Sequence, residues 1–448
     1  MLSPDNARDK LADLVARAAK AGADAADAIT VSNSSSSVHV REGQTEDVSR
    51  SESEATGLRV FVGTRSASAS TSDLSSAAMD ALVERVVAMA REAPEDPYAG
   101  LAPQELLATG PFPDIDGWDP VEPDPAALKA RALEAEDAAR AVPGVTKSNG
   151  AGAGASAATV AVATSHGFAG AYRSSGHSVS ASVIAGEGAT MQRDHDWHSA
   201  RHLEDLEPAA LIGRRAGESA VKRVGAVQVA PGVMPVLFDP RVASSLISHL
   251  MSAISGPAIA RKTSFLLDAL DTQIFARGID ILDDPLRRRG LRSRAFDGEG
   301  LPVKSQKIVE NGVLTTWLAE SASARQLGIQ PTGHASRGVS GAPGAGPANV
   351  TLSAGTRTVD AMLADLDSAI LVTELIGQGV NGVTGDYSRG AAGYLYQKGE
   401  LVGPVSEITV ASNLKTMFAT LEPANDLQLR TGVDSPTVLV PAMTVGSA

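Results

Sequence analysis

The 448-residue chain contains no cysteine. This absence excludes disulfide bonds, thiol nucleophiles, iron–sulfur clusters and every zinc site with a thiolate ligand, so a metal would need histidine and carboxylate ligands. Aromatic residues make up only 4% of the chain, which disfavours the stacking platforms that bind single-stranded nucleic acids. No apolar run approaches the roughly 18 residues that a membrane span requires. We therefore expect no membrane-spanning segment.

Basic residues are outnumbered by acidic ones, 39 against 52, and the formal net charge is −13. Without a basic stripe, this charge repels a phosphate backbone, so we expect no nucleic-acid partner. The first 22 residues form a charged amphipathic pattern and lack the apolar core of a secretory signal. These features predict a cytoplasmic protein.

Helical periodicity occurs in four segments of the first half. The first segment begins at a cap, Ser3 or Asp5, and ends at Gly22; its predicted apolar face is Leu11, Leu14, Val15 and Ala18. The second runs from Asp73 to Pro94, with a predicted apolar face of Leu82, Val86 and Met89. The other two cover about 125–140 and 208–223.

Strand-like alternation of small polar and apolar residues separates these helices and predicts antiparallel strands, most clearly over 148–197. The stretch 94–125 contains eight prolines, which predicts a long connection between subdomains. Beyond about residue 228, a buried strand leads into an apolar helix and then into many short strands. We predict an α+β fold with mixed and antiparallel sheets in two domains, an N-terminal α+β domain (1–227, with a central subregion from about 125) and a β-rich C-terminal domain (228–448).

Glycine-rich motifs cluster in the segment 377–390. Gly377, Gly379 and Gly382 match GxGxxG, but strand-like text follows where dinucleotide binding needs a helix N-terminus, so a glycine-rich loop is favoured. The adjoining GDYSRG differs from GxSxG because Asp386 replaces the first glycine, and no helix follows Ser388. A structural turn is the favoured interpretation, although polar groups between glycines also suit a cleft.

Histidines cluster between residues 166 and 202. His195, His198 and His202 would share one face if their segment were helical, and with Asp194 or Asp196 they could bind zinc or nickel. No HExxH motif is present, so solvated or hydrogen-bonded histidines are the favoured alternative. The near-paired carboxylates Asp283, Asp284, Asp297 and Glu299 could act in acid–base chemistry, but Asp-Pro and Asp-Gly sequences favour turns.

Several long blocks of the chain resemble the PmbA/TldD family, whose members are also labelled modulators of DNA gyrase. The blocks include TGLRVFVGTRSASASTSDLS, RSRAFDGEGLPVKSQKIVENGVLTTWLAES and LIGQGVNGVTGDYSRGAAGYLYQKGELVGPVSEITVASNL, and together they extend over essentially the full length. The resemblance implies a fold shared by two branches. The TldD branch is similar to zinc metallopeptidases and carries HExxxH and a C-terminal cysteine. The TldE/PmbA branch lacks these ligands and pairs with TldD in a cytosolic heterodimer that degrades unfolded peptides or processes leader peptides.

The helix expected to correspond to HExxxH covers residues 243–254 and reads ASSLISHLMSAI. It has one histidine, His249, which is followed by Leu250, and it has no glutamate; the C-terminal segment has no cysteine. A lone histidine on an apolar helix is more often a packed residue than a ligand. The resemblance therefore implies a TldE/PmbA-branch chain with no catalytic residue and no bound cofactor or metal, and it implies zinc in a TldD-like partner.

The leading hypothesis is thus a non-catalytic subunit of a TldD-like peptidase that helps to enclose an unfolded peptide. The predicted cleft residues are Gly379, Asn381, Asp386, Ser388 and Arg389. An extended peptide can be held through backbone hydrogen bonds without regard to its sequence. The alternatives are a homodimer in isolation, a self-sufficient metallopeptidase that uses the 195–202 histidines, and a regulator that contacts gyrase as a protein.

Overall fold

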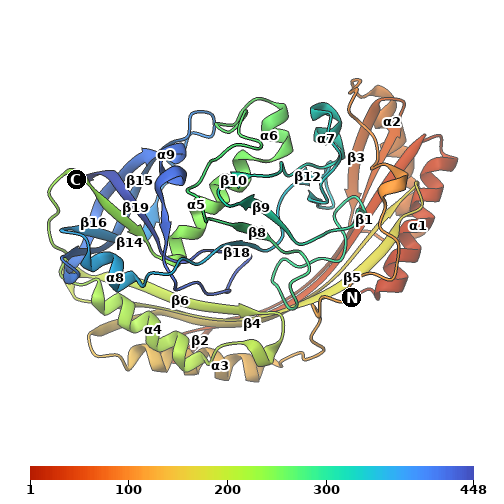
Figure 1. Cartoon of the computed structure of the whole chain (residues 1–448). Helices are drawn as coiled ribbons and strands as arrows, with labels where there is room; N and C mark the ends of the chain where they lie inside the picture. The colour runs from red at the N-terminus through yellow and green to blue at the C-terminus, as the bar shows by residue number, and fades with distance from the viewer. Residues whose placement is uncertain (448) are drawn as a thin grey trace.

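The computed structural model describes residues 1–447. The first half of the chain forms one six-stranded sheet in the order β3-β2-β1-β4-β5-β6, with every pair antiparallel. The second half contains a six-stranded sheet, β16-β15-β14-β7-β19-β17, and a five-stranded sheet, β10-β9-β8-β13-β18, each with one parallel pair. This arrangement confirms the predicted α+β class with mixed and antiparallel sheets. In Figure 1 the long strands of the first sheet curve beneath the second half.

The strands of the first sheet are β1 (Ala25–Arg41), β2 (Gln44–Val62), β3 (Arg65–Thr71), β4 (Val145–Thr164), β5 (Ala169–Ala185) and β6 (Gln192–Ala200). β1, β2, β4 and β5 have 17 to 20 residues, which is unusually long, because strands of globular proteins have about 3–10 residues. Their central parts are rich in serine, glycine and alanine, as in NGAGAGASAAT of β4. Because such side chains are short, other layers can approach both faces of the sheet closely.

Four helices pack on one face of this sheet. α1 (Pro4–Lys20) and α2 (Ser76–Glu92) cover one end, and α3 (Pro125–Arg140) and α4 (Ala209–Lys222) cover the other (Figure 1). All four lie where periodicity predicted them, and Ser3 caps α1 by accepting a hydrogen bond from the Asn6 backbone N–H. The predicted face of α2 is wrong at Met89, which is 45% exposed. The helix is rotated so that its buried side chains are Leu82, Val83, Val86, Val87 and Ala90.

The second half carries the remaining elements. Its helices are α5 (Pro240–Ala253), α6 (Gly256–Ala260), α7 (Ser321–Leu327), α8 (Val359–Ala364) and α9 (Leu414–Thr420). Its longer strands are β7 (Gly232–Phe238), β9 (Gln306–Glu310), β14 (Ala369–Ile376), β15 (Asp386–Gln397), β16 (Glu400–Asn413) and β19 (Val438–Ser447). Its short strands are β8 (Ile281–Asp283), β10 (Val313–Leu314), β11 (Ala335–Ser336), β12 (Gly344–Ala345), β13 (Val350–Leu352), β17 (Glu422–Pro423) and β18 (Val433–Asp434). Leu246, Leu250 and Ile254 of the α5 region are fully buried in the core of this half.

The second half packs against the other face of the first sheet. Phe168 and Tyr172 of the first half each contact the ring of Phe296, with centroids 5.0 and 5.5 Å apart, and Phe112 from the proline-rich connection completes this cluster. Gly57 of β2 is required here, because a Cβ at this position would lie 1.9 Å from the carbonyl oxygen of Val339. The two halves therefore meet in close contact around this cluster and Gly57.

Residues 224–231, between α4 and β7, contain neither helix nor strand. The domain division near residue 228 stays a prediction. Among residues 1–447, no helix has the length and apolar character needed to cross a bilayer.

Candidate functional site

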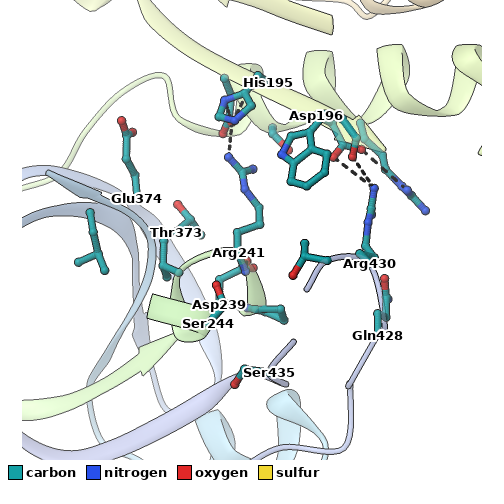
Figure 2. A pocket seen from close by; sticks show the side chains of 18 of the residues that line it. His195, Asp196, Asp239, Arg241, Ser244, Thr373, Glu374, Gln428, Arg430 and Ser435 are labelled. Carbon is teal, nitrogen blue, oxygen red and sulfur yellow. Dashed lines mark hydrogen bonds and ion pairs between the residues drawn. The ribbon is translucent and has the colours of Figure 1, made fainter. Parts of the chain in front are cut away.

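A cavity of about 790 Å³ lies where the first sheet meets the second half. Its walls come from β6, from the C-terminal end of α4, from the N-terminus of α5, from the end of β14 and from the segment 426–435. In Figure 2 His195 and Asp196 face Asp239, Arg241 and Ser244 of the α5 end, with Arg430 on another side. Most lining residues are charged or polar, so the cavity suits a polar ligand rather than an apolar one.

Asp194 on β6 is the centre of an ion-pair cluster on one wall. Arg241 of α5 contacts its Oδ1 at 2.9 Å, and Arg223 contacts its Oδ2 at 3.3 Å. Arg223 also pairs with Glu374 of β14. Burial opposes the charged form of Asp194, but the two guanidinium groups and a backbone N–H outweigh it and hold the pKa below its ordinary value. The cluster thus links the first sheet to both α5 and β14.

A second group of charges surrounds Asp196. Glu207 binds Arg215 at 2.8 Å and Arg430 at 3.1 Å, while the same guanidinium groups stay 3.8 and 3.7 Å from Asp196. The Oδ2 atom of Asp196 is buried without a hydrogen-bond partner among the described residues. A buried carboxylate oxygen in this state is available to a donor from a ligand.

The N-terminus of α5 forms the floor of the cavity. Asp239 caps the helix by accepting a hydrogen bond from the Arg241 backbone N–H at 2.9 Å, and Pro240 follows at the first helical position. Burial raises the pKa of Asp239 above its ordinary value. The Asp-Pro pair explains why α5 begins here and why Arg241 and Ser244, one turn apart, line the cavity.

The clustered histidines do not converge. His195 and His198 lie three residues apart on a strand, β6, and therefore point to opposite faces. His198 Nδ1 accepts a hydrogen bond from the Glu207 backbone N–H at 3.1 Å, and His202 Nε2 lies 3.0 Å from the Asp116 carbonyl oxygen. The histidines would share one face only on a helix, and His195 and His198 lie on a strand instead. The interpretation of hydrogen-bonded histidines is confirmed for His198 and His202.

The five predicted cleft residues lie on an exposed loop and at the start of β15. Gly379 accepts a hydrogen bond from the Ser388 backbone N–H at 2.7 Å, and a Cβ at Gly379 would lie 1.8 Å from the Ser388 carbonyl oxygen. Asn381 Oδ1 accepts a hydrogen bond from the Val383 backbone N–H, and Asp386 accepts hydrogen bonds from the side chains of Thr384 and Asn413. Arg389 Nε lies 3.4 Å from the Ile376 carbonyl oxygen.

This loop joins the cavity wall only through its preceding strand. Residues 373–375 at the end of β14 line the cavity, and the loop begins two residues later. In the part of the chain that the structure describes, none of the five predicted residues is among the cavity's lining residues. A strand, β15, follows the GxGxxG sequence, as predicted, so the glycines do not precede a helix N-terminus. Their role in a cleft remains a prediction.

The near-paired carboxylates have structural partners. Asp297 accepts hydrogen bonds from the backbone N–H groups of Glu299 and Leu301, which confirms its predicted place in a turn. Asp283 accepts from Ala348 and faces His334 at 3.2 Å. Glu299 binds Ser321 through both its backbone N–H and its hydroxyl. Each of these three carboxylates is buried and hydrogen-bonded within the protein.

The surroundings of His249 on α5 show whether this residue could be a metal ligand. Its Nε2 atom is buried without a hydrogen-bond partner among residues 1–447, and its ring stands edge-on to Tyr387 with centroids 6.2 Å apart. Burial and the cation of Arg389 lower the pKa of His249. Nothing in the described chain forms a group of three or more histidine, aspartate and glutamate side chains that could hold a metal. A catalytic zinc needs about three protein ligands, so the residues around His249 do not fit this ion.

Comparison with known sequences identifies the family. Three domain models of the PmbA/TldA metallopeptidases match the chain. Domain 1 matches residues 26–90, the central domain matches residues 118–224, and the C-terminal domain matches residues 231–447. The chain is 36% identical to metalloprotease PmbA of Escherichia coli O157:H7 over 91% of its own length and 89% of that protein. The chain belongs to the PmbA/TldD family. Its predicted resemblance is confirmed.

Two Haemophilus influenzae proteins are similar to this PmbA/TldD-family chain to different extents. A metalloprotease PmbA homologue is 35% identical over 98% of this chain and 95% of that protein. A metalloprotease TldD homologue is 23% identical over 50% of this chain and 48% of that protein. The PmbA-type relative therefore shares far more of the chain than the TldD-type relative does.

Solved structures of the PmbA/TldD family share the whole fold. A Bacteroides thetaiotaomicron protein described as a modulator of DNA gyrase aligns with a TM-score of 0.92, at 26% identity, over 100% of both chains. TldE of Thermococcus kodakarensis aligns with a TM-score of 0.86 over 98% of this chain and 100% of that one; at 19% identity this similarity concerns the fold alone.

The cavity residues were missed by the sequence analysis. Only Asp194, His195 and Asp196 were singled out, and for a different reason, as candidate metal ligands. Asp239-Pro240 is a recognisable helix start and could have drawn attention to the floor. No local sequence pattern marks the arginines or Glu374. They line the cavity because the fold brings together segments that are up to about 240 residues apart in the sequence.

Proposed function

We propose that this chain is the non-catalytic, TldE/PmbA-type subunit of a two-subunit zinc peptidase in which a TldD-like subunit supplies the metal. The composition of α5 is the observation that carries this proposal, because the helix has one histidine and no carboxylate. If His249 corresponds to the second histidine of HExxxH, Ser244 stands at the position of the first histidine and Ser245 at the position of the glutamate. Serine supplies neither zinc ligation of that kind nor a general base.

The surroundings of α5 support the same proposal. Ser245 Oγ donates to the Val242 carbonyl oxygen within the helix, so this hydroxyl is already bonded. His249 has Tyr387 and the cation of Arg389 as neighbours, and burial raises the pKa of Tyr387 to about 12, so the phenol stays neutral. A cation and an un-ionised phenol do not attract a divalent metal.

The substrate proposed for the complex is an unfolded peptide in an extended conformation. Support comes from the size of the cavity, about 790 Å³, and from the presence of both arginines and carboxylates on its walls. The exposed loop after β14, with Gly379 and Asn381, and the start of β15, with Asp386, Ser388 and Arg389, are proposed to line the route to it. Glycines in this loop allow a peptide backbone to approach closely, and backbone pairing tolerates many sequences.

Co-expression of this chain with the HExxxH homologue from the same organism tests the proposal. We expect a stable complex that contains zinc and cleaves an unfolded protein such as reduced casein, whereas the isolated chain is expected to contain no stoichiometric zinc. Replacing the glutamate of the partner's HExxxH with glutamine should abolish cleavage. The matched variant of this chain, His249→Asn, should leave both zinc content and cleavage unchanged.

Two outcomes would overturn the proposal. One is a homologue that is fully active alone and forms no complex with this chain. The other is stoichiometric zinc in the isolated chain that is lost together with peptidase activity in His198→Asn and His202→Asn, which would favour a self-sufficient metallopeptidase. Association with gyrase subunits in a pull-down, without a TldD-like subunit, would favour the regulator alternative.

A further inference from the structure

A second cavity, of about 530 Å³, lies on the first sheet beside the cavity already described. This sheet cavity is lined by residues 39–41, 46, 149–152, 180–182, 193 and 195, and it extends across β1, β4, β5 and β6. Neighbouring strands are about 4.8 Å apart, so its length from β6 to β1 is about 14 Å. Arg193 and His195 line both cavities, which therefore form one trough.

The sheet cavity lies on the face of the sheet opposite α3 and α4. His39 lies opposite Gly152 where β1 pairs with β4, and Gly152 lies opposite Ser180 where β4 pairs with β5. Residues directly opposite one another point to the same face. Their neighbours Val38 and Ala153 point to the other face and pack with α3 and α4. The trough is therefore on the face that the second half covers elsewhere.

Positive charge predominates in the sheet cavity, although the whole chain has a net charge of −13. The carboxylate among its described lining residues is Glu46, which forms an ion pair with Arg41 at 3.3 Å. The guanidinium of Arg193 then remains, together with the exposed imidazoles of His39 and His195. A ligand in this cavity therefore meets a positive charge that no lining carboxylate compensates.

Arg193 differs from the other arginines that line the first cavity. Each of those four forms an ion pair with an aspartate or a glutamate: Arg215, Arg223, Arg241 and Arg430. The side chain of Arg193 is exposed and has no ion pair or hydrogen bond to any of residues 1–447. A guanidinium presents its N–H donors in a planar fork that matches the two oxygens of a carboxylate. Arg193 is therefore free to bind a carboxylate of a ligand.

The floor of the sheet cavity allows a peptide chain to approach closely. On β4 and β5 it consists of glycine, alanine and serine residues, with Asn149 at one end. The ring of His39 lies against Gly152, where a Cβ would be 2.8 Å from two of its atoms. An extended peptide rises about 3.3 Å per residue, so about four residues cross the cavity from β6 to β1.

We propose that the sheet cavity binds a carboxylate of the peptide substrate, with Arg193 as the anchor. This inference rests on the proposed function, because it takes an unfolded peptide as the ligand. The carboxylate belongs either to an aspartate or glutamate side chain or to the C-terminus of the peptide, and both present the same pair of oxygens. The peptide then extends from the first cavity across the sheet, and peptides with a carboxylate in reach of Arg193 bind more tightly than neutral ones.

Three short synthetic peptides with an uncharged fluorophore test this binding and distinguish the two sources. The first has two central glutamates and an amidated C-terminus, the second has two central glutamines and a free C-terminus, and the third has the glutamines and the amide. In fluorescence anisotropy with the full chain, the first or the second should bind about tenfold more tightly than the third. Preference for the first identifies a side chain as the source, and preference for the second identifies the C-terminus. Equal affinity for all three, or binding of none, would overturn the proposal.

Variants of Arg193 test the anchor. Arg193→Gln should bring the affinity for the preferred peptide to within about twofold of the neutral one, and Arg193→Lys, which keeps the charge without the fork, should retain part of the preference. The matched control is Arg214→Gln on α4, because Arg214 is also exposed and has no ion pair or hydrogen bond to residues 1–447. This control changes the net charge equally and should leave the preference intact. Equal weakening by Arg214→Gln would show a general charge effect and overturn the proposal.

Kinetics of the complex with the HExxxH homologue separate this proposal from the proposed function. Arg193→Gln should raise the KM of the preferred peptide about tenfold and change its kcat by less than about twofold, because the anchor binds substrate away from the zinc. If the complex cleaves casein and Arg193→Gln leaves this KM unchanged, the carboxylate site fails and the proposed function stands. If no active complex forms but the isolated chain shows the Arg193-dependent preference, the proposed function fails and the carboxylate site stands.

Discussion

Two buried aspartates bind the first sheet to the second half of the molecule, and their surroundings differ. Asp27 on β1 is 1% exposed and contacts Arg59 and Arg337, whose side chains are also almost completely buried. Asp194 on β6 is 3% exposed, but its partner Arg241 is 39% exposed and lines the cavity. The first cluster is closed to solvent, whereas the second is open to a ligand.

This difference separates a cluster that only protein groups contact from one that a ligand in the cavity could reach. In the closed cluster each charge has only protein partners, so its contribution is to the stability of the junction between the halves. In the open cluster, water or a bound molecule can replace Arg241 at modest cost, because this partner is 39% exposed and Arg223 remains on Asp194. The same pair of residue types thus occurs in two environments that differ in exposure to solvent.

The largest expected effect comes from breaking the closed cluster. Arg337→Met leaves Asp27 with Arg59 alone in a buried site, and we expect the free energy of unfolding to fall by about 3–5 kcal/mol. Urea denaturation followed by circular dichroism measures this change. The control Arg65→Met removes an arginine from an exposed ion pair with Glu95 and should cost less than about 1 kcal/mol. Equal effects would show that the closed cluster is not special.

The closed cluster should also respond to pH through Glu299, which lies 3.8 Å from Arg59. Burial raises the pKa of Glu299 from 4.5 to about 7. Because the folded-state pKa is the higher one, the stabilisation is complete below the unfolded value and is lost as pH rises through about 7. The loss amounts to at most about 3 kcal/mol. Glu299→Gln should make the free energy of unfolding depend less on pH between pH 5 and pH 8. If the pH dependence is the same as in the wild type, Glu299 is not the group that titrates.

The open cluster should respond with the opposite sign. The arginines hold the pKa of Asp194 below its ordinary value of 3.8, so its stabilisation is present above that pH and is lost as pH falls through the lower folded-state value. Removing one half-exposed partner in Arg241→Met should cost about 1–2 kcal/mol at pH 7, because Arg223 remains. Urea titrations at pH 7 compare this variant directly with Arg337→Met. A larger loss for Arg241→Met would reverse the comparison.

The smallest effect is expected at the outer edge of the open cluster. Glu374 is 41% exposed and pairs with Arg223. Glu374→Gln should change the free energy of unfolding by less than about 1 kcal/mol. If the cavity binds peptide, the same variant should change peptide affinity in fluorescence anisotropy more than it changes stability. A purely structural Glu374 would show the reverse.

Local sequence patterns predicted the helices well because their signals lie within one or two turns. Ser3 and the proline at the start of α3 fix helix starts through neighbouring backbone groups. The start of α5 was expected at residue 243 and lies at Pro240, because the Asp239-Pro240 pair was overlooked. Met89 was misplaced because periodicity marks an apolar stripe but not the angle at which the helix meets its sheet. That angle depends on the side chains of β2 and β3 beneath the helix, among them Leu58, Val60, Ala67 and Ala69.

The histidines show the same limit at the candidate site. Their spacing suits a metal only on a helix, and pairing of β6 with β5 decides that the segment is a strand. The cavity depends even more on tertiary structure, since Asp194, Arg241, Glu374 and Arg430 belong to four separate elements or loops. No local pattern predicts that these residues meet.

The sequence by itself determined the family, the order of helices and strands, and the chemistry that is absent, because these properties depend on residue identity and short-range periodicity. The lack of cysteine and the single histidine of α5 needed no structure to be seen. Only the tertiary structure decided which charges are closed off from solvent and which face a cavity. Those properties arise from long-range pairing and from exclusion of water, which no short segment of sequence encodes.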